Sequence, residues 1–140
     1  MSDEGATYRV LQVSSVVFDL DDPSPTLHLH EAEEPYRALS IPVALADAQA
    51  LQAALANRTG RRPSTHELFS QVLAESRIDV VAARIESAEG GMFRASLDLM
   101  TPGGRVVVDA RTSDAVTLAL RQAVVAPILC REEVLAALNP

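Results

Sequence analysis

The sequence has no tryptophan, and aromatic residues account for only 4% of its 140 positions. The core must therefore consist of Val, Leu, Ile and Ala, which suit strands and closely packed helices better than a surface on which bases stack. Cys130 is the single cysteine, so an intrachain disulfide and a cysteine-based zinc site are both excluded. This cysteine usage fits a reducing compartment.

Long apolar runs are also missing. The longest are far shorter than a membrane-spanning helix requires, and the polar, acidic start at Met1–Gly5 lacks the features of a signal peptide. We therefore expect a cytoplasmic protein with no membrane contact.

Positive charge is scarce. Twelve basic residues face nineteen acidic ones, which gives a net charge of −7. The resulting field opposes the approach of polyanions, so any activity on nucleic acid requires a local arginine cluster or a bound cation.

The hydrophobic pattern predicts an α+β protein in one domain, residues 1–140, with its core at about 8–135. Apolar alternation indicates strands at residues 8–20, 26–31, 36–43, 81–88, 93–99, 105–110 and 127–129. Helical periodicity indicates helices at residues 44–56, 64–76, 114–123 and 132–138. The three strands between residues 81 and 110 form a meander, within an antiparallel or mixed sheet.

Side-chain patterns predict which faces are buried. The apolar stripe of the first helix comprises Leu45, Ala48, Leu51 and Leu55. In the meander, the apolar face comprises Val81, Ala83, Ile85, Phe93, Ala95, Leu97 and Leu99, with Arg94, Ser96 and Asp98 opposite. Ser64 and Glu67 form a capping box at the start of the second helix.

A polar elbow joins the strand at residues 105–110 to a nearly all-apolar helix. Ser113 is a suitable N-cap, and Asp114 lies where the helix dipole favours negative charge. Asp109 and Arg111 share one face of the strand, so they can pair with each other or flank a ligand. The alternative is a purely structural elbow, in which Ser113 caps and Arg111 pairs with a neighbouring acid.

A second polar cluster lies where a basic loop leads into the second helix. Arg61 and Arg62 precede a helix N-terminus, whose backbone N–H groups suit a phosphate. His66 is a candidate base in the first helical turn. The alternatives are a solvated loop and an exposed histidine without a special role.

The two clusters resemble sequences of the bifunctional nuclease family. Residues 62–68 read Arg-Pro-Ser-Thr-His-Glu-Leu, similar to the family's Arg-Pro-x-Thr-His-Asp/Glu-Leu. Residues 109–121 are similar to the family's Asp-Ala-Arg-Pro-Ser-Asp-Ala-x-x-Leu-Ala-Leu-Arg. The resemblance covers roughly residues 8–135. The chain departs from the family pattern at Thr112, where proline is usual, at Asp47, where glutamate is common, and across residues 39–44.

The resemblance implies a nuclease that hydrolyses phosphodiester bonds of DNA and RNA. In this hypothesis Asp109 and Asp114, with Asp47 as a third candidate, bind a divalent cation, Mg²⁺ or Mn²⁺. Arg62 and Arg111 hold the phosphate, and His66 moves a proton.

A different class of function is a non-catalytic ligand-binding or protein-interaction module on the same fold. Convergence of the site residues in one cleft distinguishes the two. We also expect a homo-oligomer, a dimer or larger, because a small domain cannot easily cover a helix as apolar as residues 115–120. The resemblance points the same way.

Overall fold

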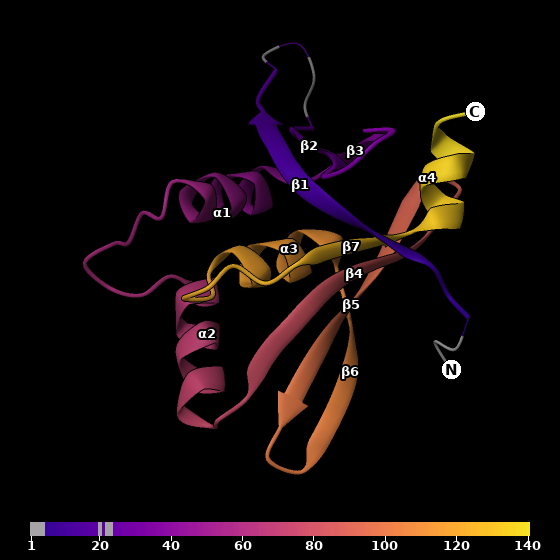
Figure 1. Cartoon of the computed structure of the whole chain (residues 1–140). Coiled ribbons are helices and arrows are strands. Elements are labelled where there is room, and N and C mark those ends of the chain that lie inside the picture. Colours follow the sequence, from indigo (N-terminus) through magenta and orange to yellow (C-terminus); the bar gives the residue numbers. More distant parts are fainter. Residues whose placement is uncertain (1–4, 20, 22–23) are drawn as a thin grey trace.

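The computed structural model describes residues 5–19, 21 and 24–140, which form one seven-stranded mixed sheet with four helices (Figure 1). Three segments named in the sequence analysis lie outside the described residues: the start at Met1–Glu4, the end of the first strand at Leu20, and the turn at Asp22 and Pro23. The strands are β1 (Tyr8–Val17), β2 (Thr26–Glu31), β3 (Ala38–Pro42), β4 (Asp79–Glu89), β5 (Met92–Thr101), β6 (Gly104–Ala110) and β7 (Ile128–Arg131). The helices are α1 (Leu45–Leu55), α2 (Thr65–Glu75), α3 (Thr112–Leu120) and α4 (Glu132–Leu138).

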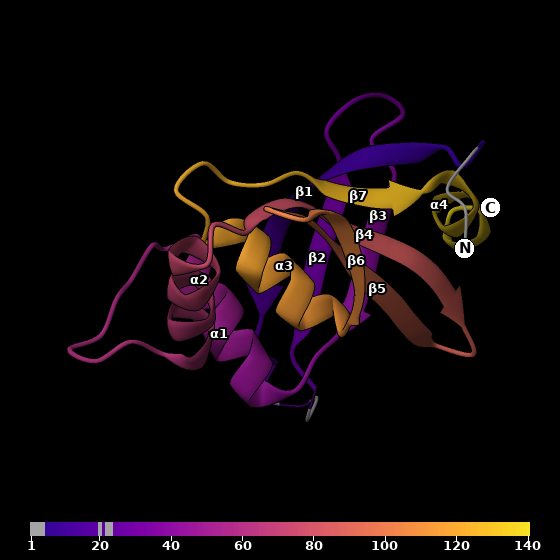
Figure 2. The ribbon, with the colours of Figure 1, turned by 90° about the horizontal axis from the view of Figure 1, so that it is seen from below.

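The strand order is β3-β2-β1-β7-β4-β5-β6, so the first strand lies inside the sheet and β3 and β6 form its edges. All neighbours are antiparallel except β4 and β7. The predicted α+β class and the β4-β5-β6 meander are confirmed. The helices α1, α2 and α3 gather at one end of the molecule and α4 lies at the other (Figure 2). None of the described helices is long and apolar enough to span a membrane.

The helix α3 is the centre of the core. It packs against α1, α2, β4 and β5, and its residues Ala115, Val116 and Ala119 are fully enclosed. The expectation that a small domain cannot cover this helix was wrong, because the chain covers it alone. An oligomer of this chain would therefore need an interface on a surface other than α3.

The boundaries of α3 also differ from the prediction. The helix begins at Thr112 rather than Asp114, and its N-cap is Arg111, not Ser113. Arg111 has an extended backbone, and its carbonyl accepts the first intrahelical hydrogen bond, from the N–H of Ala115 at 3.0 Å. The helix ends at Leu120 instead of Ala123.

The buried stripe of α1 is displaced from the predicted one. Ala48, Leu51 and Ala54 are buried, whereas Leu45 and Leu55 at the helix ends are exposed. The small alanine side chains let α1 approach α3 closely, and this contact decides which face is buried.

The strand β4 differs from simple alternation because its register with β5 shifts between Val80 and Ala82. This irregularity turns Val80 into the core and leaves Val81 exposed. The first, third and last strands occupy Tyr8–Val17, Ala38–Pro42 and Ile128–Arg131, so their predicted ends were off by one to three residues among those described.

The face of β5 that was expected to be polar is covered by ion pairs. Asp98 is buried and accepts hydrogen bonds from Arg84 at 2.7 Å and from Arg105 at 2.7 Å. The hydroxyl of Ser96 donates to Glu86, which also binds Tyr8. Long arginine side chains thus shield this side of the sheet with their aliphatic stems.

A buried carboxylate ties the end of β2 to the C-terminal helix. Glu31 is fully enclosed and accepts hydrogen bonds from Arg9 at 2.7 Å and from Arg37 at 2.6 Å. Arg37 also binds Glu132 at the start of α4. The hydrogen bond from Arg37, with that from Arg9, outweighs burial and lowers the pKa of Glu31 from 4.5 to about 2.

We expect Glu31→Gln to lower the free energy of unfolding at pH 7, because Arg9 and Arg37 lose the buried carboxylate that they share and Arg37 is left with Glu132. The native pKa lies below that of the unfolded chain, so the stabilisation is present above about pH 4.5 and is lost as the pH falls toward about 2. Urea unfolding at several pH values should show the free energies of unfolding of wild type and Glu31→Gln approaching each other as the pH falls through this range. Glu75→Gln, an exposed substitution on α2, is the control. A difference between wild type and Glu31→Gln that stays constant from pH 7 to pH 2.5 would contradict the expectation.

Candidate functional site

Four polar side chains form one connected network. The Nε2 atom of His66 lies 2.9 Å from Oδ1 of Asp114. Arg111 donates from Nε to Oδ2 of Asp114 at 2.8 Å, and from Nη1 and Nη2 to the two oxygens of Asp47 at 3.1 Å each. Three of the predicted site residues therefore converge, and Asp47 joins them.

Each member of the network comes from a different element. Asp47 lies in the first turn of α1, His66 in the first turn of α2 and Asp114 in the first turn of α3, while Arg111 joins β6 to α3. Carboxylates in a first turn are favoured by the positive end of the helix dipole.

The predicted capping box holds the start of α2, and with it His66, in place. The N–H of Glu67 donates to the Ser64 hydroxyl, and the N–H of Ser64 donates to the Glu67 carboxylate. The prediction of a reciprocal cap is confirmed.

The electrostatics of the network keep Asp114 ionised. Burial works to raise the pKa of Asp114, but hydrogen bonds from Arg111 and His66 outweigh it and hold this pKa below its ordinary value. The same contact, with the added charge of Asp47, raises the pKa of Arg111. The site thus presents a fixed carboxylate to one nitrogen of His66, while no described residue hydrogen-bonds to the other, Nδ1.

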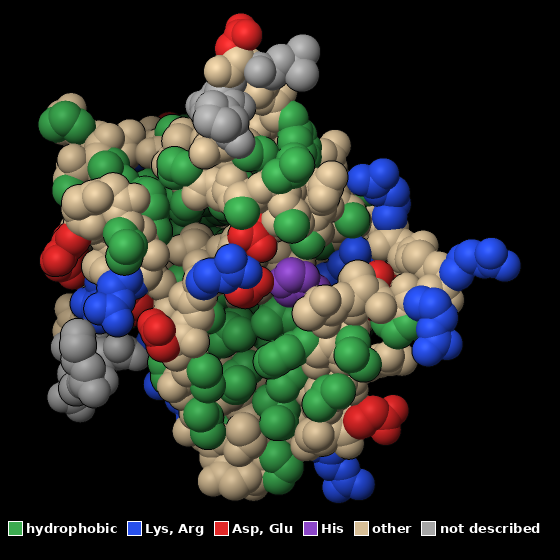
Figure 3. All heavy atoms as spheres, turned by 180° about the vertical axis from the view of Figure 1, so that it is seen from behind, with side chains coloured by type: hydrophobic (Ala, Val, Ile, Leu, Met, Phe, Trp, Pro, Cys, Tyr) green, Lys and Arg blue, Asp and Glu red, His purple; other side chains and the backbone are tan. Residues whose placement is uncertain are grey.

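The network borders a cavity of about 830 Å³ between α1, α2, α3 and β6. His66, Arg111 and Asp114 line its polar end, and Phe69, Leu97, Val108 and Leu118 are among its apolar wall residues. Figure 3 shows a hydrophobic hollow on this side of the molecule, opening beside a histidine and neighbouring acidic and basic groups.

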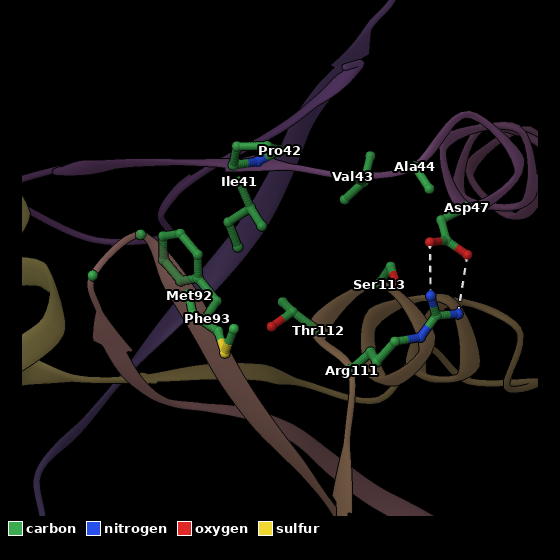
Figure 4. Close-up of a pocket in the computed structure, with 12 residues that line it drawn as sticks. Ile41, Pro42, Val43, Ala44, Asp47, Met92, Phe93, Arg111, Thr112 and Ser113 are labelled. Carbon is green, nitrogen blue, oxygen red and sulfur yellow. Dashed lines mark hydrogen bonds and ion pairs between the residues drawn. The ribbon is translucent and has the colours of Figure 1, made fainter. Parts of the chain in front are cut away.

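A second hollow, of about 540 Å³, lies on the other side of Arg111. Its walls include Ile41, Phe93 and Thr112, with Arg111 and Asp47 at one end (Figure 4). The Thr112 hydroxyl is buried and has no hydrogen-bond partner in the described part of the chain.

Arg62 lies in a third hollow, of about 360 Å³, whose wall also includes His66. Arg61, its neighbour in the sequence, does not line this hollow. Sequence reasoning missed two further residues there, Arg58 and Arg121. Arg121 ends the second sequence motif, but only its position after α3 brings it to the loop at residues 58–62.

Asp109 borders the large cavity but stands apart from the network. It pairs in register with Ser96, on the sheet face opposite α3, and is exposed. Among the described residues, none donates a hydrogen bond to its carboxylate. The structure therefore does not unite Asp109 with Asp114.

The carboxylates do not fit a divalent cation in this arrangement. Both oxygens of Asp114 and both of Asp47 accept hydrogen bonds from Arg111 or His66, and the guanidinium group already supplies the positive charge between them. In residues 5–19, 21 and 24–140, no group of three His, Cys, Asp or Glu side chains is arranged to hold a metal ion.

The sequence places the chain in one family. Residues 27–139 match the Bifunctional nuclease domain family, and this match spans most of the chain. The chain belongs to this family. No curated protein sequence matches it closely enough to show a relationship. The strand β1 precedes the matched residues, although it lies inside the sheet.

We expect Thr112→Val to leave the free energy of unfolding unchanged or to raise it, by up to about 1–3 kcal/mol, because the substitution removes a buried hydroxyl that lacks a partner. The matched control is Thr117→Val in the same helix, whose hydroxyl donates to the Ser113 carbonyl at 2.6 Å. That substitution should cost about 1 kcal/mol. Urea unfolding of both variants tests the contrast, and equal destabilisation would show that the Thr112 hydroxyl has an acceptor.

Proposed function

We propose that this chain hydrolyses phosphodiester bonds of DNA and RNA at the cavity bordered by His66, Arg111 and Asp114. The observation that carries this proposal is the chain of contacts from His66 through Asp114 to Arg111 at the polar end of that cavity. Membership of the Bifunctional nuclease domain family supports it.

His66 is the general base in this proposal. A neutral imidazole that donates from Nε2 to Asp114 has its lone pair on Nδ1, which accepts the proton of the attacking water. The water oxygen bonds to phosphorus as the P–O bond to the leaving sugar oxygen breaks. The leaving oxygen takes up a proton from solvent, and the imidazolium releases its own to solvent. The ionised Asp114 fixes this tautomer and stabilises the imidazolium that forms. Neither role requires Asp114 to take up a proton.

Arg111 binds the phosphate. Its guanidinium has five N–H groups, and the contacts with Asp47 and Asp114 engage Nε, Nη1 and Nη2 in four hydrogen bonds. One N–H therefore remains for a phosphate oxygen, on a side chain that is 64% exposed. Arg62 contributes a second positive charge from the other side of His66.

No step of the reaction is assigned to Mg²⁺ or Mn²⁺, because the donor set does not fit a cation held by Asp109 and Asp114. Dependence on either ion stays a prediction from the family resemblance. In this proposal His66 and Asp114 move the proton and Arg111 and Arg62 bind the phosphate, with no step routed through a cation.

The second candidate is a non-catalytic ligand-binding or interaction module. The hydrogen bonds of Arg111 favour this alternative. Four of its five N–H groups are engaged with Asp47 and Asp114, so the side chain can serve only to join α1 to α3. In that case the network stabilises the fold and no substitution changes a catalytic signal.

We expect His66→Gln and Asp114→Asn to reduce cleavage of single-stranded DNA and RNA by about 10²–10⁴-fold, as loss of a general base does. His28→Gln, on β2 and outside the site, is the matched control and should cleave like wild type. Asp109→Asn should also retain activity, and activity should survive excess chelator.

Thermal melts of each variant separate loss of chemistry from loss of folding. Equal cleavage by wild type and His66→Gln would refute the assigned base. Activity that disappears both in chelator and in Asp109→Asn would instead support the cation site predicted from the sequence. An inactive, well-folded wild type would favour the non-catalytic module.

Assembly of two copies through the edge strand β6 is proposed as well. Val106, Val107 and Val108 are exposed on this edge, and no strand of the described residues pairs with its outer side. Two such edges pair antiparallel about a two-fold axis, which satisfies both. The exposed valines account for the expected oligomer better than the buried α3 does.

Light scattering at micromolar concentration should give the mass of a dimer for wild type and of a monomer for Val107→Lys, because a charged side chain blocks edge pairing. Val10→Lys, an exposed position on the inner strand β1, should remain dimeric. A wild type that is monomeric at every concentration would exclude assembly through β6.

A further inference from the structure

The hollow beside His66 carries more positive than negative charge, unlike the chain as a whole. Three guanidinium groups, of Arg58, Arg62 and Arg121, line it with a single carboxylate, that of Glu67. The chain as a whole carries a net charge of −7. Positive charge is therefore concentrated at this one place against the overall field.

Arg121 is the feature that indicates a ligand. Its side chain is only 7% exposed, and its Nε–H is buried with no acceptor among the described residues. The carboxylate of Glu67 lies 4.0 Å from Nη2, too far for a hydrogen bond. An enclosed guanidinium whose nearest carboxylate is 4.0 Å away is stabilised by an anion that enters the hollow, because the anion supplies further negative charge.

An oxyanion is the ligand that fits these donors. The N-terminus of α2, an eleven-residue helix, contributes Ser64, His66 and Glu67 to the same wall, so the positive end of its dipole faces the hollow. The chain contains no lysine: all twelve of its basic residues are arginines. Planar guanidinium groups match the oxygens of a phosphate in pairs.

The position of the hollow relates it to the proposed reaction. His66 lines both this hollow and the large cavity, so the base stands between the arginines here and Arg111 on its other side. One substrate molecule can place one phosphate in the hollow and another in the large cavity only if it carries several phosphate groups, as a polynucleotide does.

We propose that the hollow lined by Arg58, Arg62 and Arg121 binds a second phosphate of a polynucleotide substrate, next to the phosphate that is cleaved. This inference rests on the proposed function for the identity of the substrate. The phosphate site itself is defined by the arginines and is measurable without any cleavage.

Calorimetric titration with inorganic phosphate at pH 8 and low salt tests the site. Wild type should bind, and Arg62→Gln and Arg58→Gln should each weaken the affinity about tenfold or more, the effect of losing one charge-assisted hydrogen bond. Arg61→Gln is the matched control, because it removes the same charge from the same loop without altering the wall, and its affinity should stay within about twofold of wild type.

Arg121→Lys keeps the charge but loses the planar fork, and it should also weaken binding. If this buried substitution prevents folding, Arg58→Gln and Arg62→Gln decide the question. Equal losses in Arg61→Gln and Arg62→Gln would overturn the site, since they would indicate only diffuse attraction. Absence of phosphate binding by wild type would overturn it too.

The substrate assignment has its own readout. Cleavage of an oligonucleotide by Arg58→Gln should show a raised KM, whereas a dinucleoside monophosphate, which has no second phosphate, should be cleaved equally by wild type and Arg58→Gln. Asp114→Asn, which leaves the wall of the hollow unaltered, should bind phosphate like wild type and fail to cleave, so the two proposals fail separately. An equal KM effect on both substrates would overturn the second-phosphate assignment while leaving the proposed hydrolysis intact.

Discussion

The Arg111 guanidinium is the interaction on which the site depends. It leaves β6, joins Asp47 of α1 to Asp114 of α3, and through Asp114 fixes His66 of α2. The N-terminal turns of three helices are thereby held around one cavity. The planar fork is essential for this, because a lysine ammonium group cannot bind two carboxylates bidentately with fixed geometry.

In the proposed function, this arrangement allows an acidic protein to bind an anion. Asp47 and Asp114 both accept hydrogen bonds from Arg111, whereas Glu67 is the one carboxylate that lines the hollow with Arg58, Arg62 and Arg121 in the described part of the chain. Positive charge is thus balanced where it organises the helices and exceeds negative charge in the hollow that we propose as a phosphate site. The global field then disfavours non-specific adhesion of polyanions elsewhere on the surface.

Much of this architecture was predictable from local patterns. The meander, the capping box of Ser64 and Glu67, and the C-terminal helix follow from residues close together in the sequence. The start of α3 was not predictable in this way. Ser113 is a residue type that favours the N-cap but lies within the helix, and nothing in the local sequence favours Arg111 as the N-cap.

The site was predictable only in part, for a related reason. His66, Arg111 and Asp114 belong to two sequence motifs, and their convergence could be expected once the motifs were taken to share a site. Asp109 has the same residue type and motif as Asp114, yet strand alternation directs it to the other sheet face. The basic hollow depends on packing between the end of α3 and the loop before α2, which no periodicity encodes.

The position of β1 has a consequence for biosynthesis. This strand is synthesised before its partner β7, which lies more than a hundred residues further along the chain, and Tyr8 pairs with Arg131. Until β7 emerges from the ribosome, β7 cannot join β1-β2-β3 to β4-β5-β6, and each of these three-stranded ribbons keeps an open edge. The sheet is therefore completed only after β7 has been made.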